Sequence, residues 1–230
     1  MKRAVEVFTF ERRSARSPMV ELAWRTHSEP EESFISAAAS HWEMVVTRQA
    51  DLARLTVRGP ETRATMASIP QDAVFFGIQF THGAFMPGLL PGRLVDRSFT
   101  ATPSGRHSVW LDGCRIGLPD PENADAFVER LVSAGLLVHD SVAAAAVRGD
   151  VAALSTRSIE RRVARATGLT RGAIRQIRRA EQAVELLCQG LPPLDVVHHA
   201  GYADQSHMTR ALKRLVGRTP SQIAAFATSD

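Results

Sequence analysis

Arginine, glutamine, serine and threonine side chains recur at helical spacing in two C-terminal segments, residues 156–166 and 204–216. In each segment apolar residues occupy one face of the expected helix, and these polar residues lie outside that face. Arginine can bond both acceptors of a guanine, glutamine pairs in the same way with adenine, and serine or threonine serves either base. The residue types therefore suit hydrogen bonding to base edges in the major groove of a DNA duplex.

Start and stop signals bracket the helices that must hold these side chains. Ser155 is a good N-cap before 156–166, and Gly168 supplies a stop after it. Thr170 then caps a longer expected helix over 172–188, which carries a continuous apolar stripe. The positions of the stripe are Ala173, Ile174, Ile177, Ala180, Val184 and Leu187.

The end of the chain reads as a helix-turn-helix. A short helix over 194–199 is followed by a corner at 200–202 and a last strong helix over 204–216. Gly201 suits a turn that needs a positive φ, and Tyr202 can seat that turn against the core. By pattern alone, a helical hairpin with a solvated outer face remains an alternative.

The charge distribution favours a polyanion as partner. Residues 1–135 hold 15 Lys or Arg and 16 Asp or Glu, whereas residues 136–230 hold 13 and 8. Between Arg157 and Arg179 there are eight arginines and one glutamate. A basic segment attached to a neutral one points to nucleic acid, although a solvated helix face gives a similar pattern.

Residues 194–222, LDVVHHAGYADQSHMTRALKRLVGRTPSQ, resemble the C-terminal signature of the AraC/XylS family of transcription regulators. The matching elements are Gly201-Tyr202, Asp204, Gln205-Ser206-His207, Arg210, Lys213, Gly217 and Thr219-Pro220. Upstream, Ser155 to Arg162 and Thr167-Gly168-Leu169 resemble the first helix-turn-helix of the same family, and 180–190 its linker helix. Two motifs in the right order and spacing make the resemblance specific over about residues 140–225.

This resemblance implies two helix-turn-helix units that are joined by a long helix and read two successive major-groove segments. The first recognition helix would be 156–166 and the second 204–216. Residues expected to face bases are Arg157, Glu160, Arg161, Gln205, Ser206, Thr209 and Arg210, with His207 and Lys213 contacting bases or phosphates. Residues expected on phosphates or on a solvated face are Arg165, Arg171, Arg175 and Arg214.

Two functional roles and one structural role are open for Glu160. Its carboxylate can accept from cytosine N4, or it can orient Arg157 or Arg161. The structural alternative is a surface pair between residues four apart on one helix.

Two positions depart from the family pattern. The positioning helix of the first unit, residues 141–154, is expected to be truncated or broken, because 151–154 is a short and poorly marked segment. In the second unit Val197 stands where the family usually has a small alanine, which requires a small residue on the facing helix.

The first 118 residues are rich in expected strands. Residues 42–47, 52–57 and 74–80 are β-prone runs, with a turn over 58–61 and a loop-rich region from Gly83 to Gly92. This pattern suits a small β-sandwich or barrel and resembles the compact cupin-like sensor domains of some family members. We expect an α+β chain with a cupin-like domain over 1–118, a linker helix region over 119–139 and a DNA-binding domain over 140–230.

In the family such N-terminal domains bind small effectors or mediate dimerisation. Trp24, Trp42 and Trp110 suit either an apolar ligand pocket or an ordinary core, and His41 and His82 either an effector contact or a structural hydrogen bond. An apolar cavity with converging polar groups would favour a sensor, and a filled core would favour a pure dimerisation or docking role.

No catalytic or metal-binding motif accompanies these segments. The histidines stand at 27, 41, 82, 107, 139, 198, 199 and 207, without the His-x-His pair of a metal-binding cupin. Walker, GxGxxG, HExxH and GxSxG motifs are missing as well. We therefore expect no metal, no cofactor and no enzymatic activity. The competing interpretation is a cupin-like enzyme or binding protein with a basic helical appendage.

Composition sets the remaining expectations. The chain has 230 residues, 44% of them hydrophobic, and no apolar run long enough to cross a membrane. The N-terminus lacks a secretory signal, and two cysteines, Cys114 and Cys188, indicate a reducing compartment. We expect a cytoplasmic protein that binds double-stranded DNA, with a small effector, a second copy of the chain and, for an activator, RNA polymerase as further partners.

Overall fold

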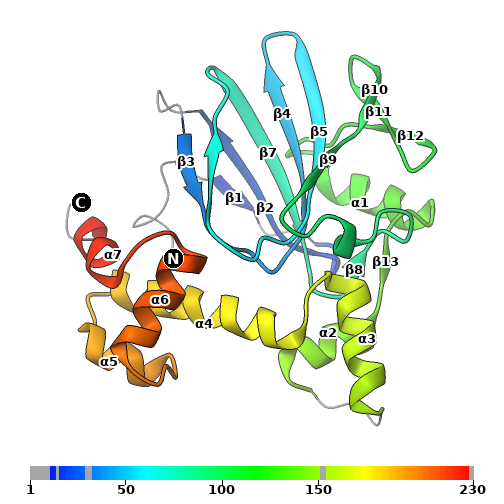
Figure 1. The fold of residues 1–230 in the computed structure, drawn as a ribbon. Coiled ribbons are helices and arrows are strands. Elements are labelled where there is room, and N and C mark those ends of the chain that lie inside the picture. Colours follow the sequence, from blue (N-terminus) through cyan, green and yellow to red (C-terminus); the bar gives the residue numbers. More distant parts are fainter. Residues whose placement is uncertain (1–10, 14–15, 29–32, 151–153, 228–230) are drawn as a thin grey trace.

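A computed structural model describes residues 11–13, 16–28, 33–150 and 154–227. A β-rich region comes first and a helical region follows it, as Figure 1 shows, which confirms the expected fold class. The expected strands over 42–47, 52–57 and 74–80 are present. Several other strands, including the long β2 (Val20–His27), were not predicted.

An antiparallel sheet of six strands in the order β1-β2-β7-β4-β5-β9 dominates the described part of the β-rich region. Its strands are β1 (Glu11–Arg13), β2 (Val20–His27), β4 (Glu43–Gln49), β5 (Leu52–Arg58), β7 (Ala73–Phe80) and β9 (Ser98–Thr100). Smaller ladders pair β3 (Ser33–Ser36) with β6 (Thr65–Ser68), β8 (Ala84–Phe85) with β13 (Val138–His139), and β10 (Thr102–Gly105) with β11 (Ser108–Leu111) and β12 (Cys114–Gly117).

The two faces of the large sheet have different neighbours. Successive side chains alternate between faces, so Met44, Val46, Leu55 and Ile78 join one apolar core. That core also contains Phe127, Val128 and Leu131 of helix α1 (Ala124–Ser133). The intervening side chains, such as Val45 and Thr56, line a cavity on the opposite face.

Gly77 lies in the middle of β7 and makes room for Trp24. The two residues are cross-strand partners between β7 and β2. A Cβ at Gly77 would lie 2.0 Å from a ring atom of the Trp24 indole, which is too close for any side chain. The glycine therefore lets the indole lie directly against the strand.

The helical region continues from α2 (Ser141–Arg148) and α3 (Thr156–Thr167) to α4 (Arg171–Cys188). It ends with α5 (Pro193–His199), α6 (Gln205–Leu215) and α7 (Pro220–Ala227). Both expected caps are in place: Ser155 and Thr170 accept from backbone N–H groups of α3 and α4. Asp204, which was expected inside the last helix, caps α6 instead. α2 ends at Arg148, which confirms a truncated positioning helix, and 151–153 lie outside the described residues.

The helical region is attached to the β-rich region at both recognition segments. The backbone N–H of Ala38 donates to Leu215 O at 2.7 Å, and the N–H of Ala64 donates to Arg214 O at 2.8 Å. These bonds satisfy carbonyls at the end of α6 that have no partner within the helix. At the end of α3, a Cβ on Gly168 would lie 2.8 Å from the backbone of Pro91 and Gly92, which form a short 3-10 helix, η1 (Pro91–Arg93).

A buried histidine joins α4 to the β-rich region. His82 shares a hydrogen bond with Ser40 through Nε2 at 3.0 Å, and its Nδ1 lies 3.4 Å from the guanidinium of Arg178. The ring centroids of His41 and His82 are 3.9 Å apart. Burial, His41 and Arg178 together lower the pKa of His82 to about 3, and burial with Arg178 lowers the pKa of His41 to about 4.

We expect Gly77→Ala to lower the free energy of unfolding by about 1–3 kcal/mol, because the new methyl group overlaps the indole of Trp24. Urea denaturation would measure this loss. Gly117→Ala is the matched control, since Gly117 also lies in a strand but a Cβ there would meet nothing closer than 3.8 Å. Equal stabilities of the two variants would contradict the close contact.

We expect the free energy of unfolding to fall as the pH decreases from 6.5 to about 4, because His41 and His82 must be neutral in the fold. Their folded pKa values lie below 6.5, so acid protonates the unfolded chain first. The raised pKa values of Glu43 and Glu181 act in the opposite direction.

Denaturation of His82→Gln over the same pH range isolates the histidine effect. The variant should show a shallower pH dependence than the wild type, and His107→Gln, at an exposed position, should match the wild type. A slope in His82→Gln as steep as in the wild type would exclude His82 as a source of acid sensitivity.

Candidate nucleic-acid interface

One carboxylate fixes the two helices of the first unit relative to each other. Asp140 caps α2 by accepting from the N–H of Ala143 at 3.0 Å, and its second oxygen accepts from Arg162 Nη1 at 2.9 Å. Arg162 belongs to α3, whose apolar positions Ile159 and Val163 are buried. The apolar face of α3 therefore points into the core, and its polar face is left outside.

The second unit is formed by α5, a glycine turn and α6. Gly201 has φ +70°, a left-handed conformation in which glycine carries no steric penalty. Tyr202 is only 7% exposed and packs in the helical core, as the sequence predicted. Asp204 caps α6 through a bond from His207 N at 2.7 Å, and Val197 is buried in a core that also holds the small residue Ala183.

α4 connects the two units through a buried apolar stripe. The buried positions of this helix are Ile174, Ile177, Ala180, Ala183, Val184 and Leu187. They share one core with residues of α3, α5 and α6, and α3 and α6 stand at opposite ends of α4 (Figure 1). The positions of both recognition helices are thus tied to the same helix.

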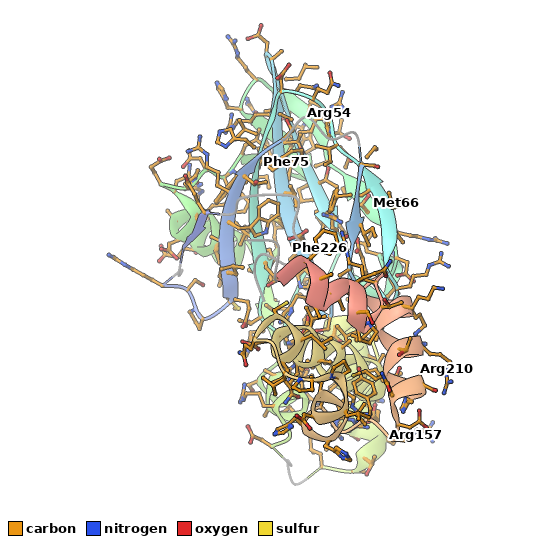
Figure 2. All side chains as sticks on the ribbon, turned by 90° about the vertical axis from the view of Figure 1, so that its left-hand side faces the viewer. Arg54, Met66, Phe75, Arg157, Arg210 and Phe226 are labelled. Atoms are coloured by element: carbon orange, nitrogen blue, oxygen red, sulfur yellow. The ribbon has the colours of Figure 1, made fainter. Side chains whose placement is uncertain are left out.

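The arginines predicted to read bases are available for contact. Arg157 and Arg161 of α3 and Arg210 of α6 are exposed, and within the described residues no ion pair engages them. Figure 2 shows Arg157 and Arg210 along the same side of the molecule. The two helices can therefore present these cations to a common surface.

Two other predicted residues of α3 have partners within the chain. Glu160 Oε1 lies 3.7 Å from Arg171 Nη1 at the start of α4, so its neighbour is neither Arg157 nor Arg161. The guanidinium of Arg165 lies over the ring of Phe85, 5.4 Å from its centroid. Arg165 thus contacts the β-rich region while it remains exposed on one side.

The predicted residues of α6 differ in exposure. Gln205, Ser206 and Lys213 are exposed, whereas Thr209 is half-buried and donates back to Gln205 O at 2.8 Å. His207 stands edge-on to Tyr202, with ring centroids 5.3 Å apart. The first turn of α6 therefore offers the freest polar side chains of this unit.

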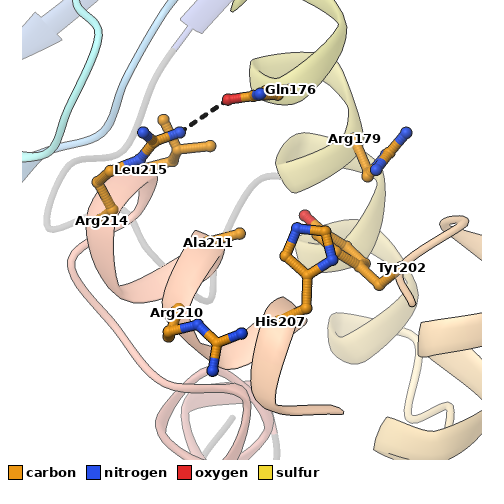
Figure 3. A pocket seen from close by; sticks show the side chains of 8 residues that line it. All are labelled: Gln176, Arg179, Tyr202, His207, Arg210, Ala211, Arg214 and Leu215. Atoms are coloured by element: carbon orange, nitrogen blue, oxygen red, sulfur yellow. Dashed lines mark hydrogen bonds between the residues drawn. The ribbon is translucent and has the colours of Figure 1, made fainter. Parts of the chain in front are cut away.

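A basic groove lies between α4 and α6 (Figure 3), with a volume of about 380 Å³. Arg179, Arg210 and Arg214 line it, and no carboxylate is found among its lining residues in the described chain. Arg214 donates to Gln176 Oε1 at 2.8 Å, and Arg179 lies over the Tyr202 ring at 5.5 Å. Tyr202 also lines the groove, and its hydroxyl is buried with no hydrogen-bond partner among the described residues.

An unpaired buried hydroxyl beside three arginines suits an anionic oxygen. A backbone phosphate of DNA bound to α6 has that chemistry. Sequence reasoning missed Gln176, Arg179 and the hydroxyl role of Tyr202, because these residues come from the linker helix and the turn. Their convergence depends on the packing of α4 against α6, and no local spacing signals it.

Two further searches cover the same described residues. No helix among them is both long and apolar enough to cross a membrane. No group of three or more His, Cys, Asp or Glu side chains in this part of the chain is arranged to hold a metal ion.

Comparison with protein families agrees with this geometry. Residues 149–225 match the helix-turn-helix domain family, over about a third of the chain. The matched family model describes an AraC-type helix-turn-helix. The match spans α3 to α6 and most of α7, including both of the helices expected to read DNA, and it supports a DNA-binding regulator. Searches of curated proteins and of solved structures gave no match.

We expect Tyr202→Phe to change the free energy of unfolding by less than about 0.5 kcal/mol, since the lost hydroxyl has no partner in the free protein. The same variant should bind all DNA duplexes more weakly, because a phosphate in the groove loses one donor. Denaturation and duplex titration of the same preparation would measure both quantities. Unchanged affinity for every duplex would remove the groove from the DNA interface.

Proposed function

We propose that this protein is a sequence-specific transcription regulator that reads two successive major-groove segments with α3 and α6. Arg157, Arg161, Gln205 and Arg210 carry most of the base discrimination. Glu160, Ser206, His207, Thr209 and Lys213 add polar contacts, and Arg165 and Arg175 contact phosphates.

The observation that carries the proposal is the joint exposure of the two recognition helices. Arg157, Arg161 and Arg210 have no ion-pair partner among the described residues, and Arg157 and Arg210 lie along the same side of the molecule (Figure 2). A cation that is left unpaired on a folded surface is available to an external anion. Arginines at the exposed positions of two linked helices match what direct readout of base edges requires.

We infer that the β-rich region is a sensor. An apolar cavity with converging polar groups favours a sensor, and a cavity of about 760 Å³ lies beside the large sheet. In this proposal residues 1–118 form the sensor, 119–139 connect it to the rest, and 140–230 bind DNA. Dimerisation, and RNA polymerase as the partner of an activator, are further parts of the proposal.

The direct test is fluorescence anisotropy with labelled duplexes taken from upstream of the protein's own gene and of neighbouring genes. A random duplex is the control, and the salt concentration is varied. We expect affinity for one duplex to exceed that for random DNA by about 10³ or more. Weak binding to all duplexes alike, with a steep salt dependence, would contradict sequence-specific readout.

We expect Arg161→Ala and Arg210→Ala each to cost about 1–3 kcal/mol on the specific duplex and to relax base preference there. Arg106→Ala removes an equal charge from an exposed ion pair in the β-rich region and should leave DNA affinity unchanged. Arg175→Ala should weaken specific and random duplexes alike and flatten the salt dependence. Wild-type affinity in either of the first two variants would mean that the recognition helix is misassigned.

A further inference from the structure

The cavity of the β-rich region is bounded by three structural elements. The outward faces of β2, β4, β5 and β7 form one wall, and the β3–β6 ladder forms another. Helix α4 contributes the side chain of Glu181. Figure 1 shows the β3–β6 ladder beside the large sheet, with α4 running across the lower end of both. At about 760 Å³, the cavity is large enough for a small organic molecule.

One wall of the cavity combines an aromatic surface with a carboxylate. The Trp24 indole, which lies against Gly77, donates from Nε1 to Glu43 Oε2 at 3.1 Å. Phe75 and Phe34 add further rings to the lining. Aromatic faces attract cations as well as apolar groups, so this wall suits a ligand that carries both.

Arg58 is the cation of the lining, and it is already paired. Its Nη1 lies 3.2 Å from Glu43 Oε1, and its Nη2 lies 2.8 Å from Glu61 Oε1. Two carboxylates thus share one guanidinium, and burial raises the pKa of one of them, Glu43. His41, also in the lining, is neutral at physiological pH because burial lowers its pKa to about 4.

Glu181 adds a further carboxylate, on which the charge of Arg178 acts. Among the described residues, no hydrogen bond or ion pair reaches its side chain. The nearby Arg178 directs its guanidinium elsewhere, to Val147 O and to His82. Burial raises the pKa of Glu181, so the ionised carboxylate is incompletely solvated and would gain from a positive charge beside it.

We propose that this cavity binds an amphipathic organic cation, whose ammonium group pairs with Glu181 and whose apolar body lies on the rings of Trp24 and Phe75. The inference rests on the proposed sensing role of the β-rich region and specifies the class of its ligand. An organic anion would have to displace Glu43 or Glu61 from Arg58 and would approach Glu181 with like charge.

The ion pair with Glu181 would also connect the bound ligand to the helical region. Glu181 belongs to α4, which positions both recognition helices. Ala38 also lines the cavity, and its N–H bonds to Leu215 O at the end of α6. A cation held between Glu181 and the sheet stabilises the arrangement in which both helices face one side, so it raises affinity for specific DNA.

Isothermal titration calorimetry of the full chain without DNA tests the ligand class. The probes are 4-phenylbutylamine, 4-phenylbutanol and 4-phenylbutyrate, which share one apolar body and differ in charge. We expect the amine to bind at least ~10-fold more tightly than the other two. Because the chain carries a net charge of +4, non-specific attraction would favour the carboxylate instead. Equal binding of the three, preference for the carboxylate, or no binding would overturn the proposal.

A pair of variants on α4 localises the site. Glu181→Gln keeps the side-chain shape and removes the charge, and should weaken amine binding ~10-fold or more. Glu185→Gln removes the same charge one helical turn further on, at an exposed position outside the lining, and should bind the amine like the wild type. Equal amine affinities in the two variants would exclude Glu181 as the partner.

The effect on DNA is measured separately, by anisotropy with the specific duplex at saturating amine. Affinity should rise at least ~3-fold in the wild type and in Glu185→Gln, and stay constant in Glu181→Gln. An unchanged or lower wild-type affinity would overturn the regulatory part of the inference. The calorimetry requires no DNA, so failure of the ligand proposal is distinguishable from failure of the proposed DNA-binding function.

Discussion

Burial of the apolar stripe on α4 is the interaction on which the arrangement of both recognition helices depends. Ile174 and Ile177 lie near the start of this helix, and Val184 and Leu187 lie near its end, yet all four belong to one core. A helix of 18 residues is about 27 Å long, so its two ends hold α3 and α6 at a separation comparable with one turn of DNA, about 34 Å. Because an α-helix resists compression and bending, the spacing of the two units is set by covalent geometry and a shared core.

The large sheet contributes to both an apolar core and a cavity, because successive side chains of its strands point to opposite faces. Met44 and Ile78 point to the α1 side and complete a densely packed core, while Glu43, Val45 and Gln79 point to the cavity. A one-residue shift in register would exchange these two sets of side chains and place the carboxylate of Glu43 in the apolar core. This arrangement also requires Gly77, because only a residue without a Cβ lets Trp24 lie against β7.

Much of the helical region could be predicted from the sequence. Ser155, Gly168 and Thr170 act through bonds to residues a few positions away, so a local pattern is enough to identify them. In the β-rich region the strands with the strongest apolar runs were equally visible. β2 was missed because its partner β7 lies some fifty residues away in the sequence, and its alternation is interrupted by a bulge between Val20 and Leu22.

The candidate sites differ in the same way: some of their residues can be identified from local sequence patterns, and others only from the tertiary structure. Exposed residues of α3 and α6 could be selected from helical periodicity alone. The basic groove could not, because Arg179 and Tyr202 come from different elements and meet through tertiary packing. Glu181 could not be identified for the same reason. In the sequence it is an ordinary polar position of an amphipathic helix, and only the placement of the sheet makes it part of a cavity.

The position of Glu181 also determines how binding in the cavity can affect DNA. A ligand can shift a conformational equilibrium only through contacts that differ between the two conformations. Among the described residues that line the cavity, Glu181 is the one that the helical region supplies. The sheet residues that would hold the body of a ligand keep the same neighbours wherever α4 lies, whereas an ion pair with Glu181 exists only while α4 stays against the cavity. The charge of the ligand, more than its apolar area, therefore connects binding in the cavity to the position of the recognition helices.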